Sequence, residues 1–390
     1  MKKAIVILLA LGVGSLLSVS CGSPAPLWLA DAASVQELLE SAEGLGNLAL
    51  AASETSVLIA GARSRPGSGL VVLFAVEATP EGRIRSRRVL LDLEPDAELL
   101  DIKAGYGGDG NAVFSIAALV ERPSGGDTAF FWEIPAAGEP EGAVQLELAD
   151  RVGEEVVARD LHIIHFDGGA FLLYGADAFA SADTLNSAMV LARAGEAPLA
   201  LGRYPSGMLW EITRAGTGAG GIAVARSWRE GEVFATALTL FDAKGLSLAG
   251  PRVLFTAKYL FDTIFAWDAD RREFAMLWGT SHRYWFQRIG LEEGELQQRM
   301  SPSPEVRFDA TVVALRPESG RYLVVLEDGR RLFSRFIGAA GELSGAVSEL
   351  VGIGETGNRR LHVLAHAWSG RRLAALLSFG ENFAYRLLEP

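Results

Sequence analysis

Cysteine is almost absent from this 390-residue sequence, because Cys21 is its only thiol. An intramolecular disulfide is therefore excluded as a source of stability. Sustained helical periodicity is also scarce, since only residues 34–43 have the spacing of an amphipathic helical turn or two. The fold must be stabilised by apolar burial, for which a hydrophobic content of 49% is ample.

Recognisable catalytic and cofactor motifs are missing as well. We find no Gly-x-Ser-x-Gly element, no Walker loop and no dinucleotide fingerprint, so no cofactor is expected. His162 and His165 are three residues apart in a predicted strand and therefore point to opposite faces. His362 and His366 share a face but lie about 13 Å apart at strand spacing. Neither pair can close on one metal ion, and no metal site is expected.

The first twenty residues have the organisation of a secretory signal. Lys2 and Lys3 precede an uncharged apolar run over residues 4–19. This run of 16 residues is shorter than the roughly 20 that a membrane-spanning helix needs. We therefore predict a signal peptide over residues 1–20.

Residues 17–22, Leu-Ser-Val-Ser-Cys-Gly, resemble a bacterial lipobox, whose cysteine is acylated and becomes the mature N-terminus. The resemblance implies a lipid attached at Cys21, a short tether over residues 21–26, and a lipoprotein of the bacterial cell envelope, outside the cytoplasm. Leu17 lies four places before the cysteine rather than the usual three. A plain secretory signal or an uncleaved anchor therefore stay open as alternatives.

The remainder of the chain predicts an all-β fold. Short apolar runs, many of them β-branched or aromatic, alternate with turns rich in Gly, Asp, Ser and Pro. Examples are residues 70–76, 113–120, 169–174, 222–226, 274–278 and 322–326. No linker or change of texture follows Pro26, so we expect a single domain over residues 27–390.

A repeat of about 52 residues runs through this domain. A strand, a polar tip, a glycine and another strand recur at intervals of 56, 57, 50, 49 and 47 residues. The tip glycines are Gly82, Gly138, Gly195, Gly245, Gly294 and Gly341. Two further apolar runs precede each tip, so a unit has four strands, and glycine supplies the positive φ that tight hairpins need.

Units of four antiparallel strands at this period resemble the blades of a β-propeller. Dividing the 364 residues after Pro26 by the period gives seven blades, with six or eight as near alternatives. The last unit has three strands, and we expect the N-terminal segment, residues 27–39, to supply its outer strand and close the ring. A large β-sandwich or β-helix is the competing architecture. The resemblance is to the architecture, and no named propeller family fits.

Candidate ligand-binding residues come from the loops of two blades. Nine aromatic residues lie within residues 259–286 of the predicted fifth blade: Tyr259, Phe261, Phe265, Trp267, Phe274, Trp278, Tyr284, Trp285 and Phe286. They either pack between blades or form a platform for sugar rings or an apolar partner. The loops of this blade contain Lys258, Tyr259, His282 and Arg283, and the longest equivalent loop of the third blade, residues 175–186, contains Asp177 and Asp183.

These observations favour a membrane-anchored, extracytoplasmic binding or scaffolding module without enzymatic activity. The alternative is a hydrolase or lyase that acts on glycans or peptidoglycan. Expected partners are membrane lipid, through the acylated N-terminus, and an envelope protein or glycan. The formal net charge is −12, and no nucleic-acid partner is expected.

Overall fold

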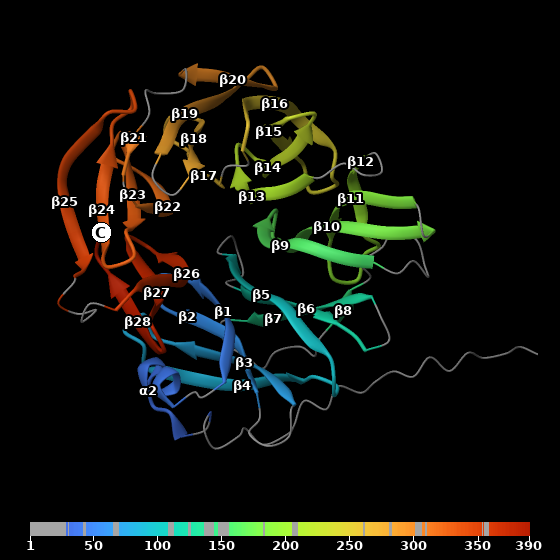
Figure 1. Ribbon diagram of the computed structural model, residues 1–390, viewed down its shortest axis with the longest axis vertical. Helices are drawn as coiled ribbons and strands as arrows, with labels where there is room; N and C mark the ends of the chain where they lie inside the picture. The colour runs from blue at the N-terminus through green and yellow to red at the C-terminus, as the bar shows by residue number, and fades with distance from the viewer. Residues whose placement is uncertain are drawn as a thin grey trace, which may run out of the picture.

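The computed structural model describes residues 29, 31–41, 44–64, 70–107, 113–123, 126–135, 144–146, 156–181, 184–204, 210–259, 262–280, 283–300, 306–308, 310–352, 354 and 359–390. Seven antiparallel sheets are arranged as blades around a common centre, so the chain forms a seven-bladed β-propeller (Figure 1). The predicted fold class is confirmed. The sandwich, the β-helix and the rings of six or eight blades are excluded.

Each blade is a meander whose first strand is the innermost (Figure 1). Blade 1 has β1 (Leu45–Ala52), β2 (Val57–Ser64), β3 (Val71–Ala78) and β4 (Ile84–Asp92). Blade 2 has β5 (Glu98–Gly107), β6 (Val113–Glu121), β7 (Asp127–Pro135) and β8 (Val144–Leu146). Blade 3 has β9 (Val156–Phe166), β10 (Gly169–Ser181), β11 (Thr184–Ala192) and β12 (Leu199–Tyr204).

Blade 4 has β13 (Trp210–Gly218), β14 (Gly221–Glu230), β15 (Val233–Phe241) and β16 (Ser247–Ala257). Blade 5 has β17 (Asp262–Asp268), β18 (Glu273–Thr280), β19 (Arg283–Glu292) and β20 (Glu295–Met300), and β21 (Val306–Arg307) also pairs with β19. Blade 6 has β22 (Thr311–Glu318), β23 (Arg321–Glu327), β24 (Leu332–Ile337) and β25 (Leu343–Val351). Blade 7 has β26 (Leu361–Ser369), β27 (Arg372–Phe379) and β28 (Asn382–Leu388).

The predicted tip glycines lie in the turns between third and fourth strands. Gly82, Gly195, Gly245, Gly294 and Gly341 have φ values from 74° to 88°. Gly138 lies outside the described residues. The repeat read from the sequence is therefore the hairpin repeat of the blades.

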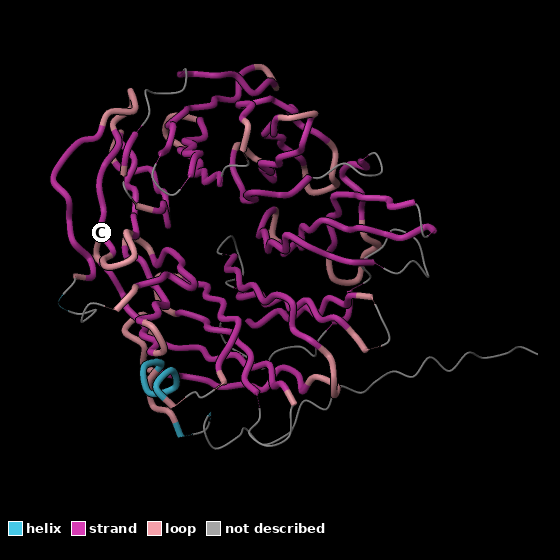
Figure 2. Tube along the Cα trace, viewed as in Figure 1, coloured by secondary structure: helices cyan, strands magenta, loops and turns pink. Residues whose placement is uncertain are grey.

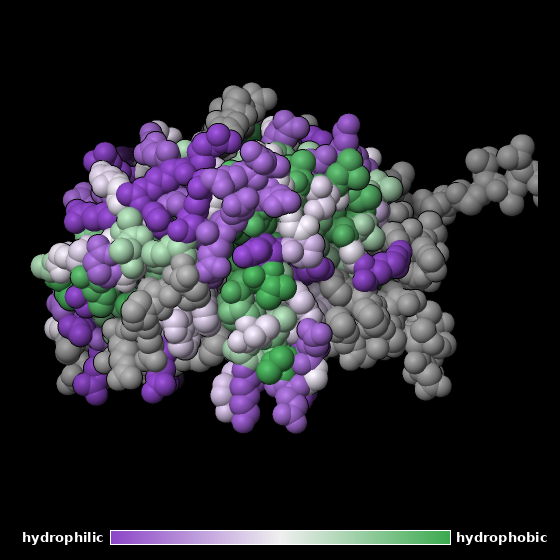
Figure 3. All heavy atoms as spheres, turned by 90° about the horizontal axis from the view of Figure 1, so that it is seen from above, coloured by the Kyte–Doolittle hydropathy of each residue, from purple (hydrophilic) through white to green (hydrophobic). Residues whose placement is uncertain are grey.

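The hydrophobic core lies between the blades. Seven clusters of buried side chains each join two neighbouring blades, and an eighth lies beneath the N-terminal segment. Middle strands such as β3 and β27 are packed on both faces and are mostly apolar, whereas outer strands such as β16 are largely exposed. The rim view shows the result, a hydrophilic surface with separate hydrophobic groups (Figure 3).

The N-terminal segment closes the ring, but as a helix rather than the expected strand. Helix α2 (Val35–Glu40) packs on β28 at the seam between blades 7 and 1 (Figures 1 and 2). Ser34 caps it by accepting a hydrogen bond from the Glu37 N–H at 3.2 Å. Blade 7 thus keeps three strands within the described part of the chain, and residues 31–39 do not add the predicted outer strand to it.

One glutamine side chain takes the place of that strand. The Gln36 amide donates from Nε2 to the Phe383 carbonyl at 3.3 Å. Its Oε1 accepts from the Tyr385 N–H at 3.2 Å. A neighbouring strand would make this same donor-and-acceptor pair with its backbone. The amide therefore satisfies the edge of β28 at the position where an outer strand would begin.

Contacts across the seam fasten the last blade to the first. The Tyr385 hydroxyl donates to the Pro80 carbonyl at 2.6 Å, and the Ser369 hydroxyl donates to the Ser53 carbonyl at 2.6 Å. Arg372 and Glu81 form an ion pair at 3.4 Å. Within the described chain, no helix combines the length and apolar character needed to cross a bilayer. Cys21 and the segments 1–20 and 21–26 lie outside the described residues.

Candidate functional site

The ring has two ends at which loops gather. At one end, here called the start face, the inner strands begin and the connections from blade to blade arrive. At the other end, the hairpin face, the inner strands end in the turns that lead to each second strand. The residues predicted to bind a ligand belong to the start face.

The predicted residues of blade 5 lie on this face without forming an enclosed site. Lys258 and Tyr259 immediately follow β16, and the lysine Nζ lies 5.9 Å from the centre of the tyrosine ring. Tyr259 is 64% exposed, and Arg283 is also exposed at the beginning of β19. His282 lies outside the described residues. The two cavities described below are lined by none of these side chains.

The other described aromatic residues of blade 5 pack between blades. Phe274 and Phe286 are fully buried, and Trp278 stacks on Phe255 of blade 4 with ring centroids 3.9 Å apart. Trp285 continues this stack at 4.7 Å from Trp278. The packing interpretation is confirmed for these rings, and the described side chains of this group form no exposed platform.

Blade 3 corrects the expectation of a long loop over residues 175–186. Strands β10 and β11 continue through it as a paired hairpin, in which Asp177 lies opposite Ser187. The Asp177 carboxylate accepts two hydrogen bonds of 3.0 Å from the Arg159 guanidinium and one of 2.7 Å from the Ser187 hydroxyl. Asp177 is therefore a structural partner that positions Arg159. Asp183 lies outside the described residues.

The histidine pairs separate as their spacing predicts. His165 packs against Gly105 and Gly107 of blade 2, whereas His162 interacts electrostatically with Arg214 of blade 4. His362 lies 3.2 Å from a carboxylate oxygen of Glu327. Among the described residues, no group of three or more potential ligands could hold a metal ion.

Carboxylates gather where the inner strands begin. Asp160 on β9 and Glu211 on β13 have raised pKa values, chiefly because burial disfavours their charged forms, and Asp160 adds to the effect on Glu211. Asp101 on β5 also raises the pKa of Asp160, and Asp262 on β17 raises that of Glu211. Four successive blades thus contribute an acid to this edge of the ring.

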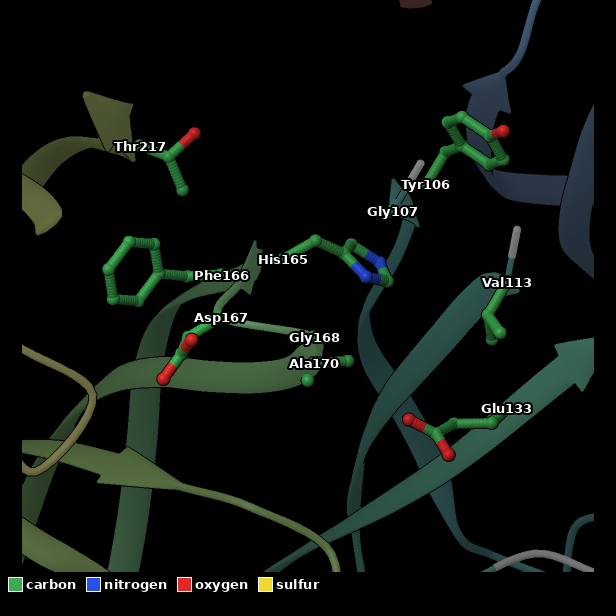
Figure 4. Close-up of a pocket in the computed structure, with 11 residues that line it drawn as sticks. Tyr106, Gly107, Val113, Glu133, His165, Phe166, Asp167, Gly168, Ala170 and Thr217 are labelled. Carbon is green, nitrogen blue, oxygen red and sulfur yellow. The ribbon is translucent and has the colours of Figure 1, made fainter. Parts of the chain in front are cut away.

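One cavity lies on the hairpin face, opposite the predicted loops. We call it the hairpin-face pocket; its volume is about 370 Å³ (Figure 4). It lies between blades 2, 3 and 4 and is lined by Tyr106, Gly107, Val113, Glu133, His165, Phe166, Asp167, Gly168, Gly169, Ala170 and Thr217. This volume falls within the range of about 300–1,000 Å³ that is typical of small-molecule sites.

Glycines on β5 allow one wall of the pocket to form. A Cβ atom at Gly107 would lie 2.4 Å from the Nδ1 atom of His165, so a larger residue cannot be placed there without moving the imidazole. His165 Nε2 is buried without a hydrogen-bond partner among the described residues. Burial lowers the pKa of His165 to about 4, against an opposing backbone hydrogen bond at Gly105. The ring is therefore neutral at pH 7.

Two carboxylates supply the polar groups of the pocket. Glu133 points from β7 toward the space beneath His165, and Asp167 lies in the turn that ends β9 (Figure 4). Both are exposed, and neither forms an ion pair with the described residues. Thr217 adds a hydroxyl group, whereas the Tyr106 ring packs on Phe114 on the other face of blade 2, with ring centroids 5.1 Å apart. No lysine or arginine is among the described lining residues.

The fold and this pocket define the chain as a seven-bladed propeller with a polar site beside its centre. No family model matches the sequence, and no curated protein sequence is significantly similar to it. The chain is similar in structure to a prolyl endopeptidase, with 14% identity and a TM-score of 0.53 over 90% of this chain and 48% of that one.

Two further structures are similar. The Pyrococcus horikoshii acylaminoacyl peptidase has 12% identity and a TM-score of 0.50, over 88% of this chain and 50% of that one. The polysaccharide lyase Uly1 has 10% identity and a TM-score of 0.52, over 88% of this chain and 90% of that one. The chain thus spans about half the length of the two peptidases. At these identities the similarity shows the fold alone.

Proposed function

We propose that this protein is a glycan-binding module whose ligand occupies the hairpin-face pocket. The observation that carries the proposal is the pair of exposed carboxylates, Glu133 and Asp167, which line the pocket together with the Thr217 hydroxyl. Carboxylates accept hydrogen bonds from sugar hydroxyls, and a threonine hydroxyl both donates and accepts them.

Binding is favoured over catalysis in this pocket. A general base works best when its pKa is near the working pH, whereas that of His165 is lowered to about 4. The described lining residues include no serine or cysteine, so a glycan-directed reaction here would have to use the Glu133 and Asp167 carboxylates themselves. His165 is therefore suited to hold its position and exchange hydrogen bonds rather than carry a proton.

Binding of oligosaccharides derived from envelope polysaccharide or peptidoglycan, measured by calorimetry, tests the proposal. Glu133→Gln and Asp167→Asn keep the shapes of the side chains but replace half of the acceptor oxygens with donors. We expect each to weaken binding by about tenfold, the effect of one or two lost hydrogen bonds. Glu295→Gln, an exposed change on β20, is the matched control. Equal affinities for all four proteins contradict the proposal.

The alternative function is a glycan-directed hydrolase or lyase. It is supported by Asp160 and Glu211 on the start face, because a carboxyl group with a raised pKa can serve as a general acid. Incubation with the same oligosaccharides distinguishes the two functions. A binding module leaves them intact, whereas an enzyme releases new reducing ends or unsaturated products that Glu211→Gln no longer forms.

We further propose that the module is held at the outside of a bacterial membrane by a lipid on Cys21. The support is the resemblance of residues 17–22 to a lipobox. Cys21→Ser is expected to abolish metabolic labelling with a fatty-acid analogue and to move the protein into the soluble fraction. Membrane association that persists unchanged in this variant contradicts the anchor.

A further inference from the structure

A second cavity on the start face contains an arginine without a counter-charge. Its volume is about 190 Å³, and it is lined by residues of blades 4, 5 and 6: Thr213, Arg214, Asp262, Thr263, Ile264, Tyr284, Val312 and Val313. Arg214 forms no hydrogen bond or ion pair with the described part of the chain, and burial alone lowers its pKa. Arg214 is half-buried, and its five N–H donors remain accessible from the cavity.

The histidines that interact with Arg214 supply no negative charge to it. His162 on β9 and His366 on β26 both have pKa values lowered to about 4, first by burial and then by the charge of Arg214. Lys103 further disfavours protonated His162, although its ammonium also contacts Asp101 at 3.0 Å. Because β26 lies three blades away from β13, the charge of Arg214 acts across the centre of the ring (Figure 1).

One buried polar atom beside the arginine also lacks a partner. Thr263 lines the same cavity and is 5% exposed, and its Oγ1 atom has no hydrogen-bond partner in the described structure. Because buried hydroxyl groups normally form hydrogen bonds, this hydroxyl can donate to a group bound in the cavity.

The acids of the start face do not neutralise Arg214. Asp262 lines the cavity, but it is exposed and makes no ion pair with the arginine. The Asp160 carboxylate accepts a hydrogen bond from the Ile212 N–H at 3.0 Å and lies 3.7 Å from Arg159. The positive charge of the Arg214 guanidinium therefore remains available to an anion.

We propose that this cavity binds a small oxyanion, a carboxylate or phosphate group, through the Arg214 guanidinium and the Thr263 hydroxyl. A planar guanidinium matches two oxygens of such a group with parallel hydrogen bonds. The site lies at the opposite end of the ring from the hairpin-face pocket, so the inference goes beyond the proposed function and is independent of it.

Titration of the full chain with sodium phosphate and with sodium acetate, at ionic strength held constant with chloride, tests the site. We expect saturable binding by calorimetry, with shifts in the ring-proton NMR signals of His162 and His366 but not of the distant, exposed His362. Tighter binding of phosphate identifies a phosphoryl ligand, and tighter binding of acetate identifies a carboxylate ligand.

Substitutions at Arg214 test whether this residue binds the anion. Arg214→Lys keeps the charge but loses the two-pronged donor, so we expect at least tenfold weaker binding, and Arg214→Gln should abolish it. Arg252→Gln on the exposed rim strand β16 is the matched control. Glu133→Gln should leave anion binding unchanged, which separates this site from the pocket. No saturable binding, or equal binding by the Arg214→Lys variant and the parent, overturns the proposal.

Discussion

At the scale of single residues, Asp160 combines a positive φ, a hydrogen bond between two blades and a partly buried carboxylate. It has a φ of 55°, at the point where the pairing of β9 with β10 is shifted by a bulge. Its side chain accepts the Ile212 N–H and thereby joins blade 3 to blade 4. Burial raises its pKa, so the ionised carboxylate is less favourable in the folded protein than in the unfolded chain.

Asp160→Asn is therefore expected to be as stable as the parent, or more stable, at pH 7. Asparagine tolerates a positive φ, keeps an oxygen for the Ile212 N–H and removes the charge that burial penalises. The gain should shrink on acidification from pH 7 to pH 4, because the raised pKa of Asp160 lets the parent carboxyl group take up a proton more readily in the folded protein than in the unfolded chain. Asp160→Ala, which loses the acceptor, should cost about 1–3 kcal/mol. Guanidinium unfolding at both pH values measures these differences, and a destabilised Asp160→Asn variant contradicts the pKa argument.

The sequence did not predict the residues that line the hairpin-face pocket. Glu133, His165 and Asp167 come from different strands and turns, and no spacing in the sequence connects them. The available signal was Gly105 and Gly107, because glycines inside a predicted strand mark a close approach by another group. Their alternation on one face of β5 could have indicated the blade 3 side chain that packs there.

At the scale of elements, the pattern of apolar runs and turn glycines was sufficient to predict the blades. This pattern did not predict segments whose strand structure depends on pairing with a neighbouring strand. Residues 175–186 are rich in alanine, which has little preference for strands, yet they form paired strands in the β10–β11 hairpin. The prediction of an outer strand at the seam was wrong over residues 31–39 for a different reason. Residues Ser34 and Glu37 have the spacing of a helix cap, but the bonding of Gln36 to β28 depends on their spatial proximity.

Gln36→Ala tests the clasp at this scale. The substitution leaves the Phe383 carbonyl and the Tyr385 N–H without their side-chain partner, at a cost of about 1–3 kcal/mol in the free energy of unfolding. Gln36→Glu retains the acceptor but loses the donor, so its effect should be intermediate. Gln297→Ala, an exposed glutamine on β20, serves as the matched control. Thermal or guanidinium unfolding that does not distinguish Gln36→Ala from this control contradicts the role assigned to the amide.

At the scale of the whole molecule, the ring places three histidines in surroundings that keep them neutral. His162, His165 and His366 lie on inner strands, and burial is the largest cause that lowers the pKa of each to about 4. In the unfolded chain a histidine has a pKa of about 6.5. Between these two values the unfolded chain binds protons that the native ring does not bind.

The free energy of unfolding should therefore fall as the pH is lowered from about 6.5 toward 4. The slope approaches about 1.4 kcal/mol per pH unit for each such histidine, and the stabilisation is fully present only above pH 6.5. Asp160 and Glu211 act with the opposite sign, because their pKa values are raised and their neutral forms are favoured on acidification. Three histidines should set the sign of the change between pH 6.5 and 5, because each of them takes up its proton in the unfolded chain within this range and not in the native ring.

Guanidinium unfolding of His366→Gln at pH 7.5, 6.5 and 5.5 isolates one contribution. Glutamine does not titrate in this range, so the variant should lose stability less steeply on acidification than the parent does. His362→Gln is the matched control, since His362 lies on the same strand, is 45% exposed and has Glu327 beside it. Its stability curve should parallel that of the parent. If the His366→Gln curve is also parallel to that of the parent, His366 is not held neutral in the folded protein. The pKa argument is then contradicted at that residue.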